Sequence, residues 1–434
     1  MAADNKPQST VFRIVQVASG NFLEMYDFMV FGYYATAIGK TFFPSTSDFA
    51  SLMAVLMTFG VGYMMRPLGA IVLGAYIDRH GRRKGLLLTL TFMAIGMLMV
   101  ACIPGYETLG FFAPLIVFLG RILQGFSAGV ELGGVSVYLA EIAPPGKKGF
   151  YVSWQSASLQ CAVITAGLIG WVLGMNLTPE QMTAWGWRIP LLAGCLIVPI
   201  LLRLRRTLRE TEEFEARTRH HQPKTRDLLR SVAANWQLVL MGMLIVSLST
   251  AAFYMITAYT PTFGQHELHL TSTDSLLVTL CIGVSNFVFV PIGGALSDRF
   301  GRRPVMVIAA LILLATAYPV LDWLVHAPSL TNMLIAEIWL SVVYSQYNGA
   351  MIVYLTEIMP VEVRTSGFSL AYGLSQTIFG GFTPAVCTLL IHETGNQAMP
   401  GVWISFAAIC ALSSITVLSL YLRRKANLAA AAAV

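Results

Sequence analysis

Two ten-residue stretches decide the fold of this chain. Residues 74–83 read Gly-Ala-Tyr-Ile-Asp-Arg-His-Gly-Arg-Arg, and residues 294–303 read Gly-Ala-Leu-Ser-Asp-Arg-Phe-Gly-Arg-Arg. A second pair is Tyr-Leu-Ala-Glu-Ile-Ala-Pro at 138–144 and Tyr-Leu-Thr-Glu-Ile-Met-Pro at 354–360. The two offsets, 220 and 216 residues, are each close to half of the 434-residue chain. The sequence is therefore a duplication of one unit, with both copies in the same orientation.

Long apolar runs separate these polar motifs. The chain is 56% hydrophobic and only 12% charged, about half the charge of a typical soluble domain, so lipid must cover part of its surface. A span needs about 20 apolar residues, and the sequence predicts an all-α membrane protein with twelve transmembrane helices. The spans are expected near 14–40, 50–76, 85–103, 110–141, 150–175, 187–206, 235–261, 273–297, 304–325, 331–358, 366–390 and 400–422.

The basic residues predict the orientation of these spans. Of the 28 Lys and Arg residues, 24 fall on one side of the twelve-span arrangement, which is expected to be cytoplasmic together with both termini. The basic clusters are short and lie between apolar runs, so the net charge of +6 does not indicate a nucleic-acid partner. The four exceptions are Lys40, Arg66, Arg121 and Arg188.

The duplication also predicts the domain organisation. We expect one six-helix bundle at 1–206, a cytoplasmic linker at 207–234 that is rich in Arg and Glu, and a second bundle at 235–434. Repeats in parallel orientation place a substrate path at their interface, reached alternately from each side of the membrane.

Other features predict little further chemistry. The first ten residues lack the layout of a cleaved signal, so the first span is expected to be retained. All six cysteines lie in apolar runs and are interpreted as packing thiols, without a disulfide, metal site or cofactor. No Ser-His-Asp set, metal-ligand spacing or phosphate loop is visible, so the sequence does not predict an enzyme.

Charges inside spans are expensive and indicate function. Arg121 lies in the fourth expected span, with Gln124 one turn on and Glu131 on the same stripe. We expect Arg121 to bind a substrate carboxylate through two parallel hydrogen bonds, or else to form a fixed ion pair with Asp27 or Glu131. Arg66 is either a second substrate cation or a structural partner of Glu24 or Asp27.

Acidic and polar side chains complete the expected site. Glu24, Asp27 and Glu131 are candidate proton carriers, because a carboxyl group in a cavity of low dielectric can take up and release a proton; static pairing with an arginine is the alternative. In the second half, hydroxyl and amide groups are expected either to bind substrate or to join helices, and they belong to Tyr254, Tyr344, Tyr347, Asn348 and Gln376.

These motifs resemble those of the major facilitator superfamily. Within it, the stretches 20–28, 65–69, 120–125 with Glu131, and 185–190 resemble the metabolite–proton symporter group over nearly the whole chain. The first stretch includes Asn21, which the resemblance places in the substrate site. The resemblance also implies a cytoplasmic latch between the halves, formed in two copies by Asp78, Arg82, Glu141 and Arg364 and by Asp298, Arg302 and Glu357.

The resemblance implies proton-coupled symport of citrate or a related di- or tricarboxylate by a monomer of the bacterial inner membrane, with no cofactor. Moving an anion into a negative-inside cell costs about 2.3 kcal/mol per charge per 100 mV, so cations must accompany it, and sodium stays open as the coupling ion. One alternative is a symporter for a zwitterionic osmolyte such as betaine or proline, but a long charged C-terminal extension is then expected. Another is a nutrient sensor that does not transport, but added cytoplasmic domains are then expected.

Overall fold

The computed structural model describes residues 10–80, 82–129, 136, 139–140, 143–206, 235–360 and 364–432. Within these ranges, the side chains outside the description are those of 10–21, 70, 74–75, 77–80, 82–83, 86, 204–206, 364–366 and 422–432. All of the regular structure described is helical. The first half of the chain is residues 10–206, and the second half is residues 235–432.

The first half contains the helices α1 (Thr10–Tyr33), α2 (Ala35–Phe42), α3 (Asp48–His80), α4 (Arg82–Ala101), α5 (Tyr106–Leu109), α6 (Phe112–Ala128), α8 (Lys148–Asn176), α9 (Pro179–Gln181), η1 (Met182–Gly186) and α10 (Arg188–Arg206). The second half contains α13 (Trp236–Tyr254), η2 (Met255–Tyr259), α14 (Thr260–His266), α15 (Ser272–Phe300), α16 (Arg302–His326), α17 (Leu330–Ile358), α18 (Arg364–Ser375), η4 (Gln376–Gly381), α19 (Thr383–Thr394) and α20 (Met399–Ala432). A described helix overlaps every one of the expected spans.

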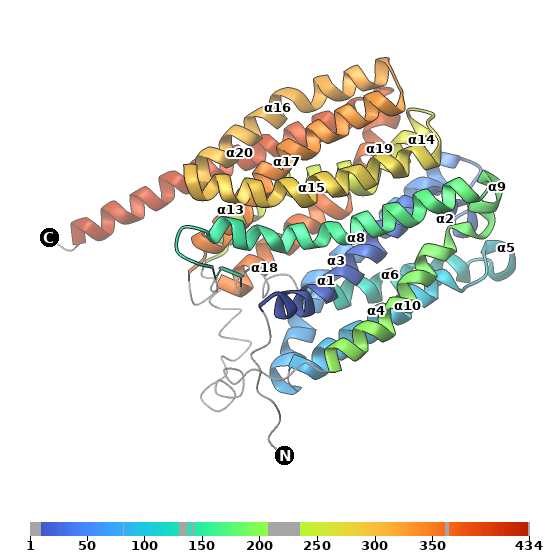
Figure 1. Ribbon diagram of the computed structural model, residues 1–434, viewed down its shortest axis with the longest axis horizontal. Helices are drawn as coiled ribbons and strands as arrows, with labels where there is room; N and C mark the ends of the chain where they lie inside the picture. The colour runs from blue at the N-terminus through green and yellow to red at the C-terminus, as the bar shows by residue number, and fades with distance from the viewer. Residues whose placement is uncertain are drawn as a thin grey trace.

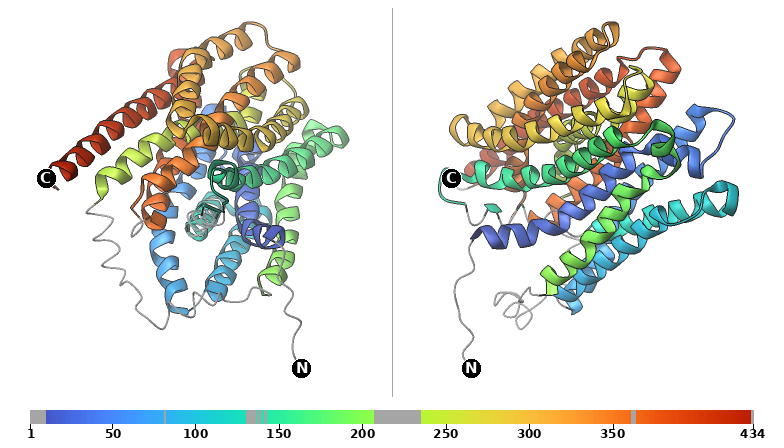
Figure 2. Two further views of the ribbon diagram at one scale, coloured as in Figure 1. Left: turned by 60° about the vertical axis from the view of Figure 1, so that its left-hand side comes forward. Right: turned by 45° about the vertical axis from the view of Figure 1, so that its right-hand side comes forward.

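The two halves form two groups of helices that lie side by side. Figure 1 shows α15, α16, α17 and α20 above and α1, α4, α6 and α10 below, and both views of Figure 2 keep this division. Helix α8 of the first half runs along α15 of the second half, and these two helices form the most extensive contact between any two elements. The central interface of the molecule is therefore an interface between the two copies of the repeat.

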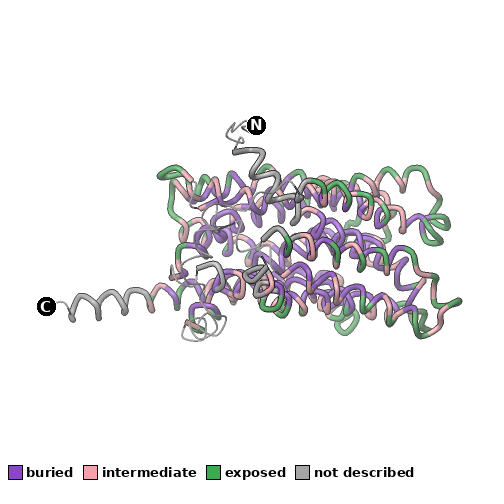
Figure 3. The backbone as a smooth tube through the Cα atoms, turned by 90° about the horizontal axis from the view of Figure 1, so that it is seen from below, coloured by how far each residue is buried: buried purple, intermediate pink, exposed green. Residues whose placement is uncertain are grey.

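Apolar side chains cover the outside of the molecule as well as its core. Figure 3 shows buried residues on the helix faces that turn toward one another, and exposed residues on the outer faces. Many of the exposed side chains are large and apolar, such as Leu196 at 74% exposure and Ile200 at 66%. Seven helices are long and apolar enough to cross a membrane, or eight if one bent pair is counted as a span, within the part of the chain that is described. Lipid is the solvent that suits such a surface.

Two prolines lie beside breaks in the α-helical structure. Pro261 and Pro384 each lie in the first turn of a helix that follows a π-helical turn, η2 or η4. Proline lacks an N–H and its ring disturbs the preceding turn, and a wider turn accommodates both effects. Pro67, by contrast, lies inside the continuous helix α3. The two π-helical turns place Tyr254 and Gln376 at breaks in their helices.

Candidate functional site

Two buried ion pairs lie at the centre of the first half. Helix α1 supplies both carboxylates, Glu24 and Asp27, which are three residues apart and so share a face. Arg66 of α3 lies 2.7 Å from Glu24, and Arg121 of α6 lies 2.8 Å from Asp27. All four side chains are buried. The sequence left these pairings open, and the structure joins each arginine to a different carboxylate.

The Arg121 pair is enclosed within the first half. Its Nη1 donates hydrogen bonds to Asp27 and to Gln124, and Gln124 Nε2 donates to the other oxygen of Asp27 at 3.1 Å. The guanidinium also lies over the rings of Phe28 and Phe31, 4.1 and 4.3 Å from their centroids. Cation–π contacts and a charged hydrogen bond offset part of the cost of burying the charge. In this arrangement Arg121 faces protein on every described side.

The Arg66 pair lies at the interface between the halves. Arg66 Nη1 donates a 2.6 Å hydrogen bond to Oε1 of Gln376, the first residue of η4 in the second half. Its guanidinium lies 4.1 Å from the centroid of Tyr63 and 4.8 Å from that of Phe28. Arg66 Nε has no hydrogen-bond partner among the described residues, and neither do Nε and Nη2 of Arg121. The contact with Gln376 is therefore what distinguishes Arg66, because it connects the two halves directly.

Aromatic rings from both halves meet beside Arg66. The Tyr63 and Tyr254 rings pack edge to face with centroids 5.2 Å apart. Close approach here requires glycine, because a Cβ at Gly381 would lie 2.6 Å from the Tyr63 ring and one at Gly380 would lie 2.8 Å from Tyr254. Tyr63 is not among the residues expected from the sequence, although its position one turn before Arg66 on α3 is a usable signal.

The remaining polar residues expected in the site lie on α17, and they face α13. Tyr347 donates a 2.6 Å hydrogen bond to the carbonyl oxygen of Ile245, so its hydroxyl serves helix packing. Ser249 donates to Asn348 Oδ1 at 2.8 Å, whereas Asn348 Nδ2 has no partner among the residues described. Tyr344 is buried and its ring lies 6.0 Å from that of Phe253. None of these three side chains has a recorded contact with Arg66 or Arg121.

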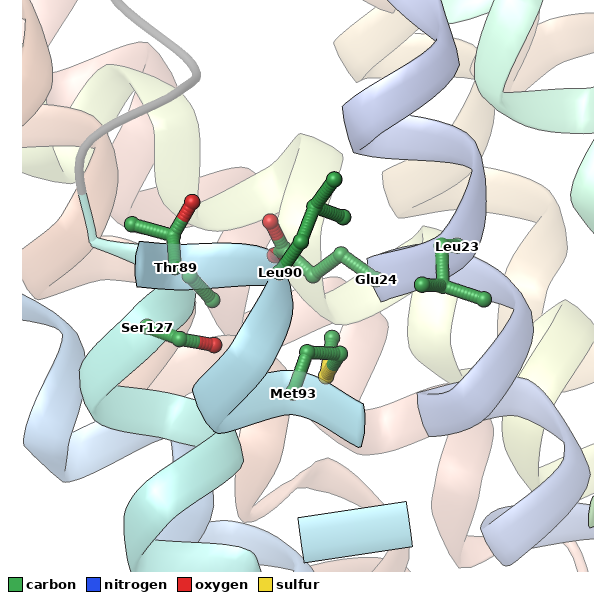
Figure 4. A pocket seen from close by; sticks show the side chains of 7 residues that line it. Leu23, Glu24, Thr89, Leu90, Met93 and Ser127 are labelled. Carbon is green, nitrogen blue, oxygen red and sulfur yellow. The ribbon is translucent and has the colours of Figure 1, made fainter. Parts of the chain in front are cut away.

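A small pocket reaches Glu24 from the side of the first half. Figure 4 shows it between α1, α4 and α6, with the side chains of Glu24, Thr89 and Ser127 turned toward it. Leu23, Leu90, Met93 and Ala128 complete its lining. It has room for about one water molecule, and its hydroxyl groups could hold one. The pocket adjoins the carboxylate that pairs with Arg66 and leaves Asp27 enclosed.

The second copy of the expected latch is assembled at one end of the molecule. Arg302 Nη1 lies 2.6 Å from Asp298, and its Nη2 lies 3.4 Å from Glu357. The Asp298 carboxylate also accepts hydrogen bonds from the backbone N–H groups of Gly149 and Phe150, at 2.8 and 2.9 Å. A carboxylate at the first turn of α8 is favoured by the free amides and by the helix dipole. Asp298 thereby fastens the second half to the first.

The opposite end of the molecule is also joined across the halves. Thr36 Oγ1 and His266 Nε2 share a 2.9 Å hydrogen bond, and the rings of Phe49 and His392 stack with centroids 3.8 Å apart. Figure 1 shows α14, α19 and α2 together at this end, away from the start of α16. Contacts between the halves therefore lie on both sides of the two buried ion pairs.

Several residues selected from the sequence fall outside the described part of the chain. Glu131 and Glu141 are not described, and neither are the side chains of Asn21, Asp78, Arg82 and Arg364. The first copy of the latch and the third candidate proton carrier therefore stay predictions. The linker expected at 207–234 also lies outside the description.

Comparison with known proteins defines the class of this chain. A D-xylose-proton symporter structure matches with a TM-score of 0.75 at 17% identity, covering 92% of this chain and 97% of that chain. The fold is that of the major facilitator superfamily of membrane transporters. Residues 13–230 and 204–426 each match the model of a family described as "Sugar (and other) transporter". The chain belongs to this transporter family, and it is a multi-pass protein of the bacterial inner membrane.

Two curated relatives are similar over nearly their whole length. The chain is 58% identical over 399 residues to a citrate-proton symporter of Klebsiella pneumoniae, covering 92% of this chain and 89% of the relative. It is 54% identical over 411 residues to a citrate-proton symporter of Salmonella typhi, covering 95% and 94%. The superfamily indicated by the repeated motif is thus confirmed.

Proposed function

We propose that this chain is a proton-coupled symporter that carries citrate or a related di- or tricarboxylate into the cell by alternating access. The observation that carries the proposal is Arg66, a buried guanidinium of the first half that is bonded to Gln376 of the second half. A carboxylate bound at Arg66 touches both halves, so its binding is linked to their relative movement. Identity of 58% and 54% to citrate-proton symporters supports citrate as the substrate.

The proposed topology has twelve spans, with both termini in the cytoplasm. The bundles at 1–206 and 235–434 move relative to one another, and the linker at 207–234 joins them in the cytoplasm. The helices that overlap every expected span support this arrangement, as does the bias of basic residues to one side. We propose that the transporter works as a monomer, without a cofactor or enzymatic activity.

The proposed substrate anchor is Arg66, with Gln376 and Tyr254 as neighbours from the second half. A guanidinium can hold a carboxylate by two parallel hydrogen bonds, and Arg66 has an unpartnered Nε beside the Nη2 that contacts Glu24. An incoming carboxylate can take this edge by displacing Glu24. Tyr344 and Asn348 lie on the adjoining helix and are proposed to contact the rest of the substrate when the halves part, together with Asn21.

Displacement of Glu24 supplies the coupling to protons. A buried carboxylate that has lost its arginine is costly unless it takes up a proton, so substrate and proton bind together. The pocket beside Thr89 and Ser127 gives Glu24 a neighbouring site for water. Asp27, held by Arg121 and Gln124, is proposed as a second proton carrier, and Glu131 as a third.

The proposed latch controls which side of the membrane the site faces. Asp298, Arg302 and Glu357 hold the ends of α15 and α17 near the start of α8, and we place this end in the cytoplasm. The first copy, Asp78, Arg82, Glu141 and Arg364, is proposed to act at the same face. Ion pairs near the surface are weak singly, but several together bias a two-state equilibrium.

Uptake into proteoliposomes tests the function. Purified protein is given labelled citrate, tricarballylate, α-ketoglutarate or betaine, with and without an inward proton gradient. We expect a proton gradient to drive accumulation of citrate above its external concentration, and a protonophore to abolish that accumulation. Accumulation of betaine alone would contradict the substrate proposal, and accumulation that requires sodium but no proton gradient would contradict the coupling.

A further inference from the structure

Glu337 is a buried acid that the mechanism above does not use. It lies on α17 of the second half and is completely buried. Neither of its carboxyl oxygens has a hydrogen-bond partner among the described residues. Glu24 and Asp27, by comparison, each contact an arginine. A buried polar group without a partner is rare and usually has a functional reason.

No counter-charge for Glu337 is recorded in the part of the chain that is described. The charged groups described on the helices around α17 lie toward the helix ends: Lys148 on α8; Asp274, Asp298 and Arg299 on α15; Arg302, Arg303, Asp322 and His326 on α16; and His266 on α14. The other titratable groups described there are Tyr151 and Cys161 on α8, Cys281 on α15, Tyr318 on α16, Tyr254 on α13, Tyr259 in η2 and Tyr372 on α18. On α17 itself they are Tyr344, Tyr347, Tyr354 and Glu357. None forms a recorded ion pair or hydrogen bond with Glu337. An unpaired carboxylate in such a place is costly, so Glu337 is neutral and holds a proton here.

A polar network begins one turn away on the same face of α17. Ser341 Oγ lies 2.8 Å from both Ser285 Oγ and Asn286 Oδ1, and Ser345 Oγ donates to Asn286 Oδ1 at 3.0 Å. Residues 337, 341 and 345 are each four apart and therefore lie on one stripe of the helix. Asn286 Nδ2 donates to Oε1 of Gln160 on α8 at 3.3 Å. The network beside Glu337 thus crosses from the second half to the first.

The internal repeat relates this region to the two arginines. The offset of 216 residues that relates Tyr138 to Tyr354 also relates Arg121 to Glu337. The offset of 220 residues that relates Asp78 to Asp298 also relates Arg66 to Asn286. The second half therefore carries an acid and an amide at the positions where the first half carries its two buried guanidinium groups.

We propose that Glu337 is a proton-binding site in the second half, and that its proton is one of those carried with each substrate. Movement of α8 away from α15 breaks the bond between Asn286 and Gln160 and lets water reach this region. The Glu337 O–H bond then breaks, its proton passes to water on the open side, and the carboxylate is solvated by water and by Ser341. Return of the halves to the closed arrangement requires Glu337 to take up a proton again. This inference rests on the proposed proton symport.

The test is the number of protons carried per citrate by Glu337→Gln, which mimics the neutral acid. In proteoliposomes with opposed proton and citrate gradients, the gradient ratio at which net citrate flux reverses gives the number of protons per citrate. The variant is compared with wild type and with the control Glu393→Gln, whose side chain is 68% exposed. We expect one proton fewer per citrate for Glu337→Gln, retained citrate exchange, and an unchanged stoichiometry for the control. An unchanged stoichiometry in Glu337→Gln would overturn the inference.

Infrared spectroscopy tests the protonation of Glu337 without a transport measurement. The C=O band of a protonated carboxyl group is recorded for wild type and for Glu337→Asp, both labelled with carbon-13 glutamate. We expect a protonated, labelled band in wild type that is missing from Glu337→Asp, even if Glu337→Gln does not reach the membrane. Its presence in both proteins would show that another glutamate is the source and would overturn the inference. If wild type moves no citrate with protons, the proposed function fails, whereas the infrared result still tests Glu337.

Discussion

In the first half, two guanidinium groups pair with two carboxylates at the centre of the bundle, whereas the equivalent positions of the second half carry Glu337 and Asn286 without an arginine. At their ends the halves are alike, since both keep the Asp-Arg and Gly-Arg-Arg motif. The duplication has therefore kept the residues proposed to hold the halves together and changed those proposed to meet the cargo.

This difference gives each half a separate task. The first half holds positive charge that suits a carboxylate, and the second half presents tyrosine and amide groups such as Tyr254 and Gln376. A charge at the interface binds strongly but selects poorly, while hydroxyl and amide groups distinguish substrates by the positions of their hydrogen bonds. We therefore expect substitutions in the first half to change affinity or stability most, and substitutions in the second half to change selectivity.

The largest effect is expected from Arg121→Ala, which leaves Asp27 buried without its charged partner. Breaking a buried ion pair from one side costs about 3–5 kcal/mol, and the loss should shrink at acidic pH because a neutral Asp27 needs no counter-charge. Unfolding of the purified protein in detergent at pH 5 and at pH 8 measures the loss of stability relative to wild type at each pH. The double variant Arg121→Gln with Asp27→Asn is the control, and we expect it to recover much of the stability. Equal stability of Arg121→Ala and wild type at pH 8 would contradict the central charge pair.

Arg66→Lys is expected to weaken citrate binding by roughly 10- to 100-fold. The lysine keeps the positive charge beside Glu24 but loses the planar fork, and hydrogen bonds to charged groups are worth about 1.5–3 kcal/mol. The matched control is Arg203→Lys, because Arg203 is exposed at the end of α10. Calorimetric titration with citrate compares the two variants with wild type. If both bind citrate equally well, the anchor lies elsewhere, and Arg121 becomes the next candidate.

The sequence could predict the helices, because they depend on local patterns, and a described helix overlaps each expected apolar run. The repeated motif also contains Asp298 and Arg302, whose side chains pair within one helical turn, while the latch itself stays a prediction drawn from the resemblance. The sequence could not decide which arginine pairs with which carboxylate. Glu24 and Asp27 lie one turn apart on α1, so a small rotation of that helix, set by packing against α3 and α6, decides the pairing. No local sequence pattern predicts how one helix is rotated against its neighbours.

The roles expected for the two arginines show the same limit. Arg121 looked the better substrate anchor from the sequence, since Gln124 and Glu131 follow it on one stripe. The structure encloses Arg121 among Asp27, Gln124 and aromatic rings, and it brings Arg66 to Gln376 of the other half. That contact spans 310 positions and depends on the π-helical turn η4. No periodicity in the sequence signals it, so the substrate role of either arginine stays a prediction.

Gly294→Ala is expected to open the end that carries Asp298. A Cβ at Gly294 would lie 2.4 Å from the carbonyl oxygen of Gly149, so α8 and α15 cannot approach as closely. Overpacking of this kind costs about 1–3 kcal/mol, which corresponds to a shift of roughly 5- to 150-fold in the equilibrium between closed and open states. Spin labels at the ends of α8 and α16 report the distance between the halves. Gly373→Ala is the control, because a Cβ there meets nothing within 4 Å. An unchanged distance distribution would show that the duplicated ends do not set the conformational balance.

The smallest effect is expected from Tyr347→Phe, which separates packing from recognition in the second half. The Tyr347 hydroxyl donates to the carbonyl oxygen of Ile245, so its loss should cost about 0.5–1.5 kcal/mol of stability and leave citrate affinity within roughly twofold. Tyr254→Phe is the matched comparison, because Tyr254 lies beside Tyr63 at the interface. We expect the loss of the Tyr254 hydroxyl to weaken citrate binding more than the loss of the Tyr347 hydroxyl does. Binding titrations and thermal unfolding of both variants separate the two effects. If Tyr347→Phe weakened citrate binding as much as Tyr254→Phe, the Tyr347 hydroxyl would bind the substrate and would not serve helix packing alone.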